Sequence, residues 1–394
     1  MVQQLPAVLI GGPPHAGKSV LLYNLTQALY ERGIRHHAIR ACPDGEGNWF
    51  QEGNPGTVSL IRERNKNKWS DAFIQRISAD VEHRSLPFLV DMGGHPEATE
   101  LPLFRLCTHS ILLLRADKPD STRLWQQMTT EAQLQPLAHL YSEQTGTSTL
   151  TSLVPILKGT LTGLERQSKT IREDPVFDAL VERIASLFNA YALHDMEQLA
   201  LSEAPTKPAL DLPVALRAYT TTSINWQPEM LSPFLRSLAT DTPLSIHGKG
   251  PNWLYAALAA HSARQPFYQF DPKLPFGWVQ PLRVSIGEAE SSSVTIEKRR
   301  VSDATILTFT ILSGRLEYIQ PEPLLFPPVP TERGLILDGP LPYWLLTALV
   351  RLYVNSGVVW MGVHHAQQDT HKTAIVVYSR VETYAIGDLV PLSV

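Results

Sequence analysis

Cysteine is nearly absent from this sequence. Its 394 residues include only two, Cys42 and Cys107, and neither belongs to a C-x-x-C pair or stands beside a histidine at metal-ligand spacing. A disulfide framework and a zinc site built on cysteine are therefore excluded as organising features. We expect a protein of a reducing compartment, the cytoplasm.

Long apolar runs and a strong net charge are also missing. No apolar stretch reaches the roughly 18 residues that a membrane-crossing helix needs. The short apolar stretch 6–10 runs straight into a glycine loop with no basic segment before it, unlike a secretory signal. With 34 basic and 38 acidic residues the formal charge is -4, so no overall field attracts duplex nucleic acid or a membrane. We expect neither as a partner, and local geometry must hold any anionic ligand.

The first 200 residues have the pattern of a doubly wound α/β domain. Residues 7–10 form a short apolar run, a glycine loop follows, and 19–32 carries apolar residues at helical spacing. Further short strands are expected at 37–40, 87–91 and 110–115. Because these runs are apolar throughout and alternate with helical segments, they favour a largely parallel sheet covered on both faces.

The glycine loop carries the clearest motif of the chain. The segment from Gly12 to Ser19, GPPHAGKS, is a complete G-x-x-x-x-G-K-[ST] loop between a strand and a helix. Gly12 and Gly17 let the backbone fold so that its N–H groups point at phosphate oxygens. Lys18 is expected to reach the β and γ phosphates, and the Ser19 hydroxyl to bind Mg²⁺. ATP is the expected nucleotide, since no N-K-x-D motif for guanine is evident.

Two acidic residues that follow strands of this domain are candidates for catalysis. Asp91 ends the apolar strand 88–91, where it could hold the magnesium shell beside the phosphate loop, with helix capping as the alternative. Asp44 begins the loop DGEGNW after the second strand. In this respect the chain resembles small-molecule P-loop kinases, in which such a residue orients the acceptor hydroxyl and takes its proton. Ordinary loop chemistry also uses these residues, so this alternative stays open.

The C-terminal half contains an internal repeat. Residues 201–213, with three prolines, are predicted to be a linker. Beyond it, LSIHGKGPNWLYAAL from Leu244 aligns without gaps on LILDGPLPYWLLTAL from Leu335. Each copy predicts a strand, a Gly/Pro turn and a helix beginning at the tryptophan, preceded by a polar strand at 215–222 or at 305–312.

The repeat divides the remainder into two homologous domains, 208–292 and 293–394. A duplicated domain often reproduces within one chain what a homodimer does elsewhere, with the copies facing each other across a pseudo-two-fold axis. The sequence leaves open whether the chain itself forms a homo-oligomer.

The repeated G-x-x-P-x-W-L-x-x-A-L element resembles the CRISPR-associated ring nucleases of the Csx-three type. In the first copy the matching segments are GKGPNWL from Gly248, PF from Pro266 and DPKL from Asp271. In the second they are Gly339, PYWL from Pro342, AIVV from Ala374 and GD from Gly387. Together the two copies cover about half of the chain.

This resemblance implies a fold related to the CARF domains and a dimeric surface that grips cyclic tetra-adenylate, a cyclic oligoadenylate second messenger. It further implies cleavage of that ring, stimulated by a metal such as Mg²⁺ or Mn²⁺. Of the family's acidic and histidine positions only Asp271 carries over; the helix histidines are replaced by alanine, arginine and valine. The residues expected to bind the ligand are Gly248, Lys249, Gly250, Pro251, Gly339, Pro342 and Arg380.

The second copy carries a histidine cluster in place of the family's acidic turn. The segment HHAQQDTH contains His364, His365, Asp369 and His371. These residue types could coordinate a divalent metal or perform acid–base chemistry on a phosphodiester, and a solvated loop is the alternative.

Three functions remain open from the sequence. The chain could remove a cyclic oligoadenylate with its repeats while an ATP-dependent domain adds further chemistry. The repeats could instead be a sensor that controls an N-terminal kinase. Thirdly, the chain could be a kinase unrelated to CRISPR signalling.

Overall fold

The computed structural model describes residues 4–42, 71–164, 170–191, 193–221, 223, 225–274, 277–287, 294–301, 303–311, 316, 318, 324–365 and 373–392. These residues form two compact units, both of mixed α/β structure. Among the described residues, unit 1 comprises 4–42, 71–198 and 272–277, and unit 2 comprises 199–271 and 278–392.

Unit 1 is built on a seven-stranded sheet of order β2-β3-β1-β4-β5-β7-β6. All neighbouring pairs are parallel except that of β6 with β7. The strands are β1 (Ala7–Gly11), β2 (His37–Ala41), β3 (Phe88–Met92), β4 (His109–Leu114), β5 (Gln135–Ser142), β6 (Thr149–Ser152) and β7 (Leu157–Leu161). The doubly wound domain expected from the sequence is therefore present as a mainly parallel sheet.

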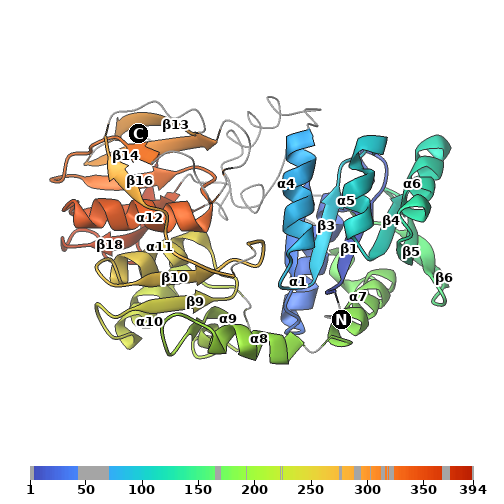
Figure 1. The fold of residues 1–394 in the computed structure, drawn as a ribbon, viewed down its shortest axis with the longest axis horizontal. Coiled ribbons are helices and arrows are strands. Elements are labelled where there is room, and N and C mark those ends of the chain that lie inside the picture. Colours follow the sequence, from blue (N-terminus) through green and yellow to red (C-terminus); the bar gives the residue numbers. More distant parts are fainter. Residues whose placement is uncertain are drawn as a thin grey trace. The chain divides into compact units, whose positions relative to one another are not determined.

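Helices cover both faces of this sheet (Figure 1). Val8 and Ile10 of β1 pack with α1 (Lys18–Glu31) and α7 (Pro175–Asn189). The alternate residues Ala7 and Leu9 pack with α4 (Asp71–Glu82), α5 (Leu101–Leu106) and α6 (Pro119–Glu131). The central strands β1, β3 and β4 are thus buried on both sides, which explains why their sequences are almost entirely apolar. The other helical segments are η1 (Ala98–Glu100), η2 (Thr170–Glu173) and α8 (Leu193–Ser202).

Unit 2 contains the two repeats, each with its own sheet. The first sheet has the order β11-β10-β9-β8 and the second β13-β14-β16-β17-β18-β19. The first repeat supplies β8 (Leu210–Asp211), α9 (Leu212–Leu216), η3 (Pro228–Met230), α10 (Leu231–Ser237), β9 (Leu244–His247), α11 (Asn252–His261), β10 (Phe267–Phe270), β11 (Trp278–Val279) and β12 (Val284–Ile286). The second supplies β13 (Val294–Val301), β14 (Ala304–Ile311), β15 (Leu324–Phe326), β16 (Gly334–Asp338), α12 (Tyr343–Asn355), β17 (Trp360–His364), β18 (Thr373–Ser379) and β19 (Leu389–Pro391).

The two repeats share one topology. In the first, β8, β9 and β10 are parallel and β11 is antiparallel to β10. In the second, β14, β16 and β17 are parallel and β18 is antiparallel to β17. The crossover that follows the Gly/Pro turn is a helix in each, α11 from β9 to β10 and α12 from β16 to β17. The strand–turn–helix units predicted at 244–258 and 335–349 therefore occupy equivalent places in two similar folds.

Helices α11 and α12 pack against each other between the two sheets (Figure 1). Tyr343 at the start of α12 stacks on Tyr255 in the first turns of α11, with ring centroids 4.4 Å apart. At the other end, Arg351 of α12 donates to the carbonyl of Ser262, which follows α11. Since start meets start and end meets end, the two helices are parallel. A pseudo-two-fold axis along the helices would relate them in this way.

The segment predicted as a linker differs from the expectation. Residues 210–211 form β8, which pairs in parallel with the end of β9. The polar strand predicted at 215–222 is not formed, because α9 and a turn occupy its described residues. The corresponding strand of the first repeat is β8, whereas the strand predicted at 305–312 is present as β14.

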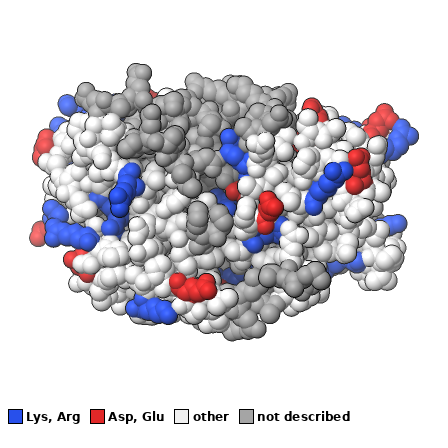
Figure 2. Space-filling view, in the orientation of Figure 1, with Lys and Arg blue, Asp and Glu red and all other residues white. Residues whose placement is uncertain are grey.

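The described surface carries charges of both signs. On the face shown in Figure 2, Lys and Arg side chains alternate with Asp and Glu rather than gathering in one large patch. No disulfide joins Cys42 and Cys107. Within the described ranges, no helix has the length and apolar character needed to cross a membrane.

Candidate functional sites

The phosphate loop lies between β1 and α1. Gly12 has a φ of 146°, and a Cβ there would lie 2.0 Å from the carbonyl oxygen of Leu113, so only glycine fits. Lys18 is 9% exposed and its Nζ donates to the carbonyls of Gly12 at 2.7 Å and Pro13 at 3.0 Å. The ammonium is therefore held inside the loop, over the N-terminus of α1, where an anion would be attracted.

The magnesium side of the loop brings Ser19 and Asp91 together. The Ser19 Oγ donates to Asp91 Oδ2 at 3.0 Å, and Asp91 is 2% exposed at the end of β3. Arg40 Nε lies 3.9 Å from the same oxygen. A hydroxyl and a carboxylate oxygen are the ligand types that Mg²⁺ prefers, so these residues fit that ion. Asp44, the predicted acceptor-orienting residue, lies outside the described residues.

Two cations that the sequence reasoning missed flank the loop from β4 and α6. Arg115 Nη1 donates to the carbonyl of His15 at 3.3 Å, and Lys118 Nζ donates to that of Pro14 at 3.5 Å. They follow β4, which is parallel to β1, so they leave the sheet at the same edge as the phosphate loop. In the sequence, the segment RADK after an apolar strand is the only sign that Arg115 and Lys118 lie beside the phosphate loop. This sign can be interpreted only when the strand next to β1 is known to be β4.

In unit 2 the two Gly/Pro turns lie close to each other. Pro251 and Pro342 are the residues immediately before α11 and α12. The Tyr343 hydroxyl donates to the carbonyl of Gly250 at 2.7 Å, across the repeats. The Tyr255 hydroxyl donates to Gly248 at 2.6 Å within the first repeat. Because α11 and α12 are parallel, both helix N-termini and both turns open at one end of the unit.

Carboxylates and imidazoles lie at this same end, where the parallel strands finish. His364 Nδ1 of β17 is 3.2 Å from Asp338 Oδ1 of β16, and both residues are buried. Thr308 of β14 donates to the other Asp338 oxygen at 3.4 Å. In the first repeat, ligand atoms of Asp211 and His247 lie within 4.8 Å of each other at the ends of β8 and β9.

The sequence reasoning named His364 but neither Asp338 nor His247. Asp338 and His247 each precede the glycine of a repeated turn. Their contacts with other side chains depend on which strands lie side by side, and the sequence does not show this. Burial, and next the neighbouring His364, lower the pKa of His365, with Glu229 acting in the opposite direction. Its ring is therefore mostly neutral near pH 7. Asp369 and His371, the remaining members of the predicted cluster, lie outside the described residues.

The other predicted ligand residues are divided between the two ends of unit 2. Asp271 follows β10, parallel to β9, and the exposed Lys249 is in the first turn, so both are at the turn end. Arg380 follows β18, whose last residue, Ser379, pairs with Trp360 at the start of β17. The structure therefore places Arg380 at the end opposite to His364 and does not bring it to the turns.

The space beside Gly250 is filled by apolar side chains of the first repeat. A Cβ at this position would lie 2.9 Å from Leu212 Cδ1 and 3.2 Å from Leu254 Cδ2. The absent side chain would point into apolar packing, so a larger residue would disturb the core of the first repeat. Gly339, in contrast, has a φ of 126°, which favours glycine through the backbone itself.

The positions of the family's helix histidines serve the packing of the repeats. Ala260 and Ala263 are buried on and just after α11. Arg351 donates through Nη1 to Ser262 and through Nη2 to Gln265, at 2.5 and 2.7 Å. No acid–base group stands at these positions.

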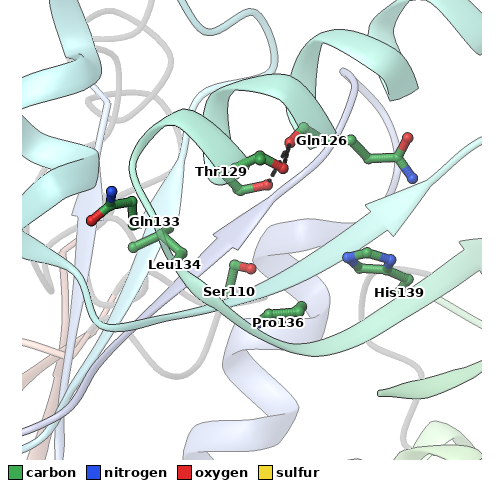
Figure 3. A pocket seen from close by; sticks show the side chains of 8 residues that line it. Ser110, Gln126, Thr129, Gln133, Leu134, Pro136 and His139 are labelled. Atoms are coloured by element: carbon green, nitrogen blue, oxygen red, sulfur yellow. Dashed lines mark hydrogen bonds between the residues drawn. The ribbon is translucent and has the colours of Figure 1, made fainter. Parts of the chain in front are cut away.

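A cavity of about 530 Å³ in unit 1 lies away from both sites (Figure 3). It is bounded by α6, β4 and β5, and its lining residues are Ser110, Gln126, Thr129, Thr130, Gln133, Leu134, Pro136 and His139. Ser110 and Pro136 are near the beginnings of their strands, whereas the phosphate loop is at the strand ends. We assign this cavity no part in nucleotide binding.

Comparison with known proteins supports a CRISPR association for the second repeat. Residues 309–391 match the family model described as CRISPR-associated protein (Cas_csx3). The match begins within β14 and ends with β19, so it covers the sheet that holds Asp338 and His364. A comparison with the curated proteins finds no match.

Two solved structures show only distant similarity. Chloroplast FtsY from Physcomitrella patens is 13% identical with a TM-score of 0.24, covering 36% of this chain and 51% of that chain. APE1195 is 12% identical with a TM-score of 0.21, covering 48% of this chain and 98% of that one. The chain thus spans about half the length of the FtsY structure. At these TM-scores neither structure bears on fold or function.

Proposed function

We propose that this chain is a CRISPR-associated enzyme that binds a cyclic oligoadenylate, such as cyclic tetra-adenylate, and cleaves it at the turn end of unit 2. Unit 1 binds ATP with Mg²⁺ or Mn²⁺ and couples an ATP-dependent reaction to this signal.

One observation carries the ligand site: the parallel packing of α11 and α12. It sets two Gly/Pro turns and two helix N-termini at one end of the unit, joined by the bond from Tyr343 to Gly250. Helix N-termini attract anions, and Lys249 adds an exposed cation in the first turn. A nearly symmetric ring of phosphodiesters suits a pair of similar turns. The family match at 309–391 supports the CRISPR association of this part of the chain. The identity of the ligand rests on the resemblance of the repeated turns.

Asp338 and His364 supply the chemistry in this proposal. His364 accepts the proton of a ribose 2′-hydroxyl as its oxygen bonds to the adjacent phosphorus, and the P–O5′ bond breaks. The leaving oxygen takes a proton from water, which leaves a linear product with a cyclic phosphate end. Asp338, 3.2 Å from His364 Nδ1, orients the ring and stabilises its protonated form. Asp271 remains a second candidate at the end of β10.

The test is incubation of the full chain with radiolabelled cyclic tetra-adenylate, with and without ATP and with Mg²⁺ or Mn²⁺. We expect a linear product, and we expect Asp338→Asn and His364→Ala to slow its formation about a hundredfold, the range typical of general base catalysis. The matched control is Asp303→Asn, an exposed carboxylate that precedes β14 and so lies at the opposite end of the same sheet. Binding without any cleavage by the wild-type chain would refute the enzyme and leave a sensor.

A sensor that controls the kinase is the second candidate, and a specific observation favours it. The family's helix histidines are replaced by groups that hold the repeats together, Arg351 above all. A domain that keeps the two ligand-binding turns, but uses the positions of the helix histidines for packing between the repeats, would bind the cyclic oligoadenylate without cleaving it. In that case ligand should alter the rate of ATP turnover while remaining intact.

A further inference from the structure

Four successive carbonyls of the phosphate loop each accept a hydrogen bond from a cationic side chain. Lys18 binds those of Gly12 and Pro13, at 2.7 and 3.0 Å. Lys118 Nζ binds that of Pro14 at 3.5 Å, and Arg115 Nη1 that of His15 at 3.3 Å. The first cation belongs to the G-K-S motif. The other two come from the segment between β4 and α6, more than ninety residues further along the chain.

The two prolines of the phosphate loop explain how Arg115 and Lys118 could contribute to phosphate binding. Pro13 and Pro14 have no backbone N–H, so this half of the loop can offer phosphate no main-chain donor. The Ala16 N–H is turned to the Pro13 carbonyl, at 3.3 Å. Arg115 and Lys118 therefore add side-chain donors beside the two residues that have no backbone N–H.

The same side of the loop faces the metal-binding strand. Gly94, three residues after Asp91, packs so tightly on Pro14 that a Cβ on it would lie 2.6 Å from Pro14 Cγ. Asp91 in turn accepts from Ser19, the residue expected to bind magnesium. The metal bridges the last two phosphates of a triphosphate. Pro14, and with it Lys118, is thus next to the terminal-phosphate side of the loop.

We propose that Lys118 binds the terminal phosphate of the nucleotide and that Arg115 is a positioning residue that fixes the loop around it. This inference rests on the nucleotide site proposed above. Lys118 is half-buried on the surface beside the loop, and its contact with Pro14 is long enough to be exchanged for a phosphate oxygen. ATP has a terminal phosphate that ADP lacks, and with it one more negative charge, so contact with this ammonium favours ATP over ADP.

Asp117 explains why the two cations act differently. It binds Arg115 with both oxygens, at 2.8 Å from Nε and 2.7 Å from Nη2, so only Nη1 is left for His15. This bond also raises the pKa of the Arg115 guanidinium. Arg115 is therefore already partnered and oriented by Asp117, whereas the Lys118 ammonium donates a long hydrogen bond to the Pro14 carbonyl and is attracted by Asp117 without a hydrogen bond to it.

The test is calorimetric binding of ADP and of a non-hydrolysable ATP analogue to the full chain with Mg²⁺. For Lys118→Met we expect affinity for the ATP analogue to fall about tenfold or more while affinity for ADP changes less than about twofold. Lys118→Arg should restore most of the preference, because it keeps the charge. Arg115→Gln should weaken both nucleotides, since it loosens the loop that holds the phosphates they share.

Arg123→Gln is the control, because Arg123 is an exposed cation of α6 whose ion-pair partner among the described residues is Asp120. Melting temperatures without nucleotide identify a variant that has lost its fold. An equal loss of both nucleotides in Lys118→Met, or no loss, would overturn the assignment of Lys118 to the terminal phosphate. A wild-type chain that binds neither nucleotide would remove the nucleotide site itself, and this outcome is separate from the other two.

Discussion

Glu100 is a buried carboxylate whose ionisation should be visible in the stability of unit 1. It ends η1 and is 1% exposed, and its Oε1 accepts a bond from the Glu97 N–H at 3.2 Å. Burial raises the pKa of Glu100 from 4.5 to about 7, against the smaller effect of that bond. Because the folded-state pKa is the higher one, the folded chain holds an extra proton between about pH 5 and pH 7. Stability should therefore fall as the pH rises through this window and level off above it.

Replacing Glu100 by Gln should remove this dependence. Glutamine keeps the bond from Glu97, as the capping box allows, but has no charge to bury. We expect Glu100→Gln to raise the free energy of unfolding by about 1–3 kcal/mol at pH 8 and to change it little at pH 5. Urea unfolding at the two pH values measures this, with Glu131→Gln as an exposed control. An unchanged pH slope in the variant would contradict the buried charge.

At the scale of single residues, the G-x-x-x-x-G-K-[ST] motif predicts the contacts within the phosphate loop far better than the repeat predicts those at the turn end of unit 2. Lys18 and Ser19 are fixed by eight consecutive residues, and Asp91 follows an apolar strand that must lie beside them. Lys118 and Asp338 carry no such signal. Their contacts arise only because β4 neighbours β1 and β16 neighbours β17, and strand order is a non-local property that spacing along the chain does not encode.

At the scale of elements, a half-buried cation, Arg351, joins the C-terminal ends of α11 and α12. Burial lowers the pKa of the Arg351 guanidinium. It donates to the carbonyls of Ser262 and Gln265, and it lies over the ring of Phe267 at 5.8 Å. Both carbonyls follow the end of α11, where main-chain acceptors have no partner within the helix. Arg351 of the second repeat therefore caps the C-terminal end of α11 in the first repeat.

The variant Arg351→Met should separate the contribution of the Arg351 hydrogen bonds from that of side-chain packing. Methionine fills much of the same space, but it removes both side-chain hydrogen bonds, while the Ser262 carbonyl still accepts from the Gln265 N–H at 3.2 Å. We therefore expect the free energy of unfolding to fall by about 1–3 kcal/mol. Arg264→Met, at an exposed position nearby, should change it by less than about 0.5 kcal/mol. Denaturant unfolding of the two variants makes the comparison. Equal stabilities would mean that the repeats are held by α11 and α12 alone.

The repeats show which elements the sequence could predict. Strand, turn and helix at 244–258 and 335–349 were specified by local features: an apolar run, a Gly/Pro turn and helical spacing. The strand before the first repeat was placed too late, because β8 has only two residues. The Asp211 side chain accepts from the Val214 N–H and Pro213 stands in the first turn of α9, so the sequence DLP was in fact a helix-start signal.

At the scale of the whole molecule, the two candidate sites belong to separate compact units. The phosphate loop is built from β1, β3, β4 and α1, all in unit 1. The turns, Asp338 and His364 are all in unit 2. No residue of one proposed site belongs to the other, so each site should be removable while the other remains. Any influence of one ligand on the other would then measure a coupling free energy between units.

We therefore expect Lys18→Ala and Lys249→Glu each to impair one activity and to leave the other unchanged. Lys18→Ala removes the ammonium that stabilises charge on the transferring phosphate, so ATP turnover should fall at least a hundredfold while cyclic tetra-adenylate binding is kept. Lys249→Glu reverses the exposed charge in the first turn, so ligand binding should weaken about tenfold while basal ATP turnover is kept. Arg380→Glu makes the same charge change at the opposite end of β17 and should leave binding within about twofold of wild type.

Calorimetry with the cyclic ligand and a phosphate-release assay, run on the same preparations, decide the outcome. If both activities fell together in either variant while the melting temperature stayed unchanged, the sites would not be independent, and the nucleotide and the cyclic ligand would share one composite site. If Arg380→Glu weakened binding as much as Lys249→Glu, the ligand would not be confined to the turn end. Stimulation of wild-type ATP turnover by the cyclic ligand, lost in Lys249→Glu alone, would establish that the repeats control unit 1.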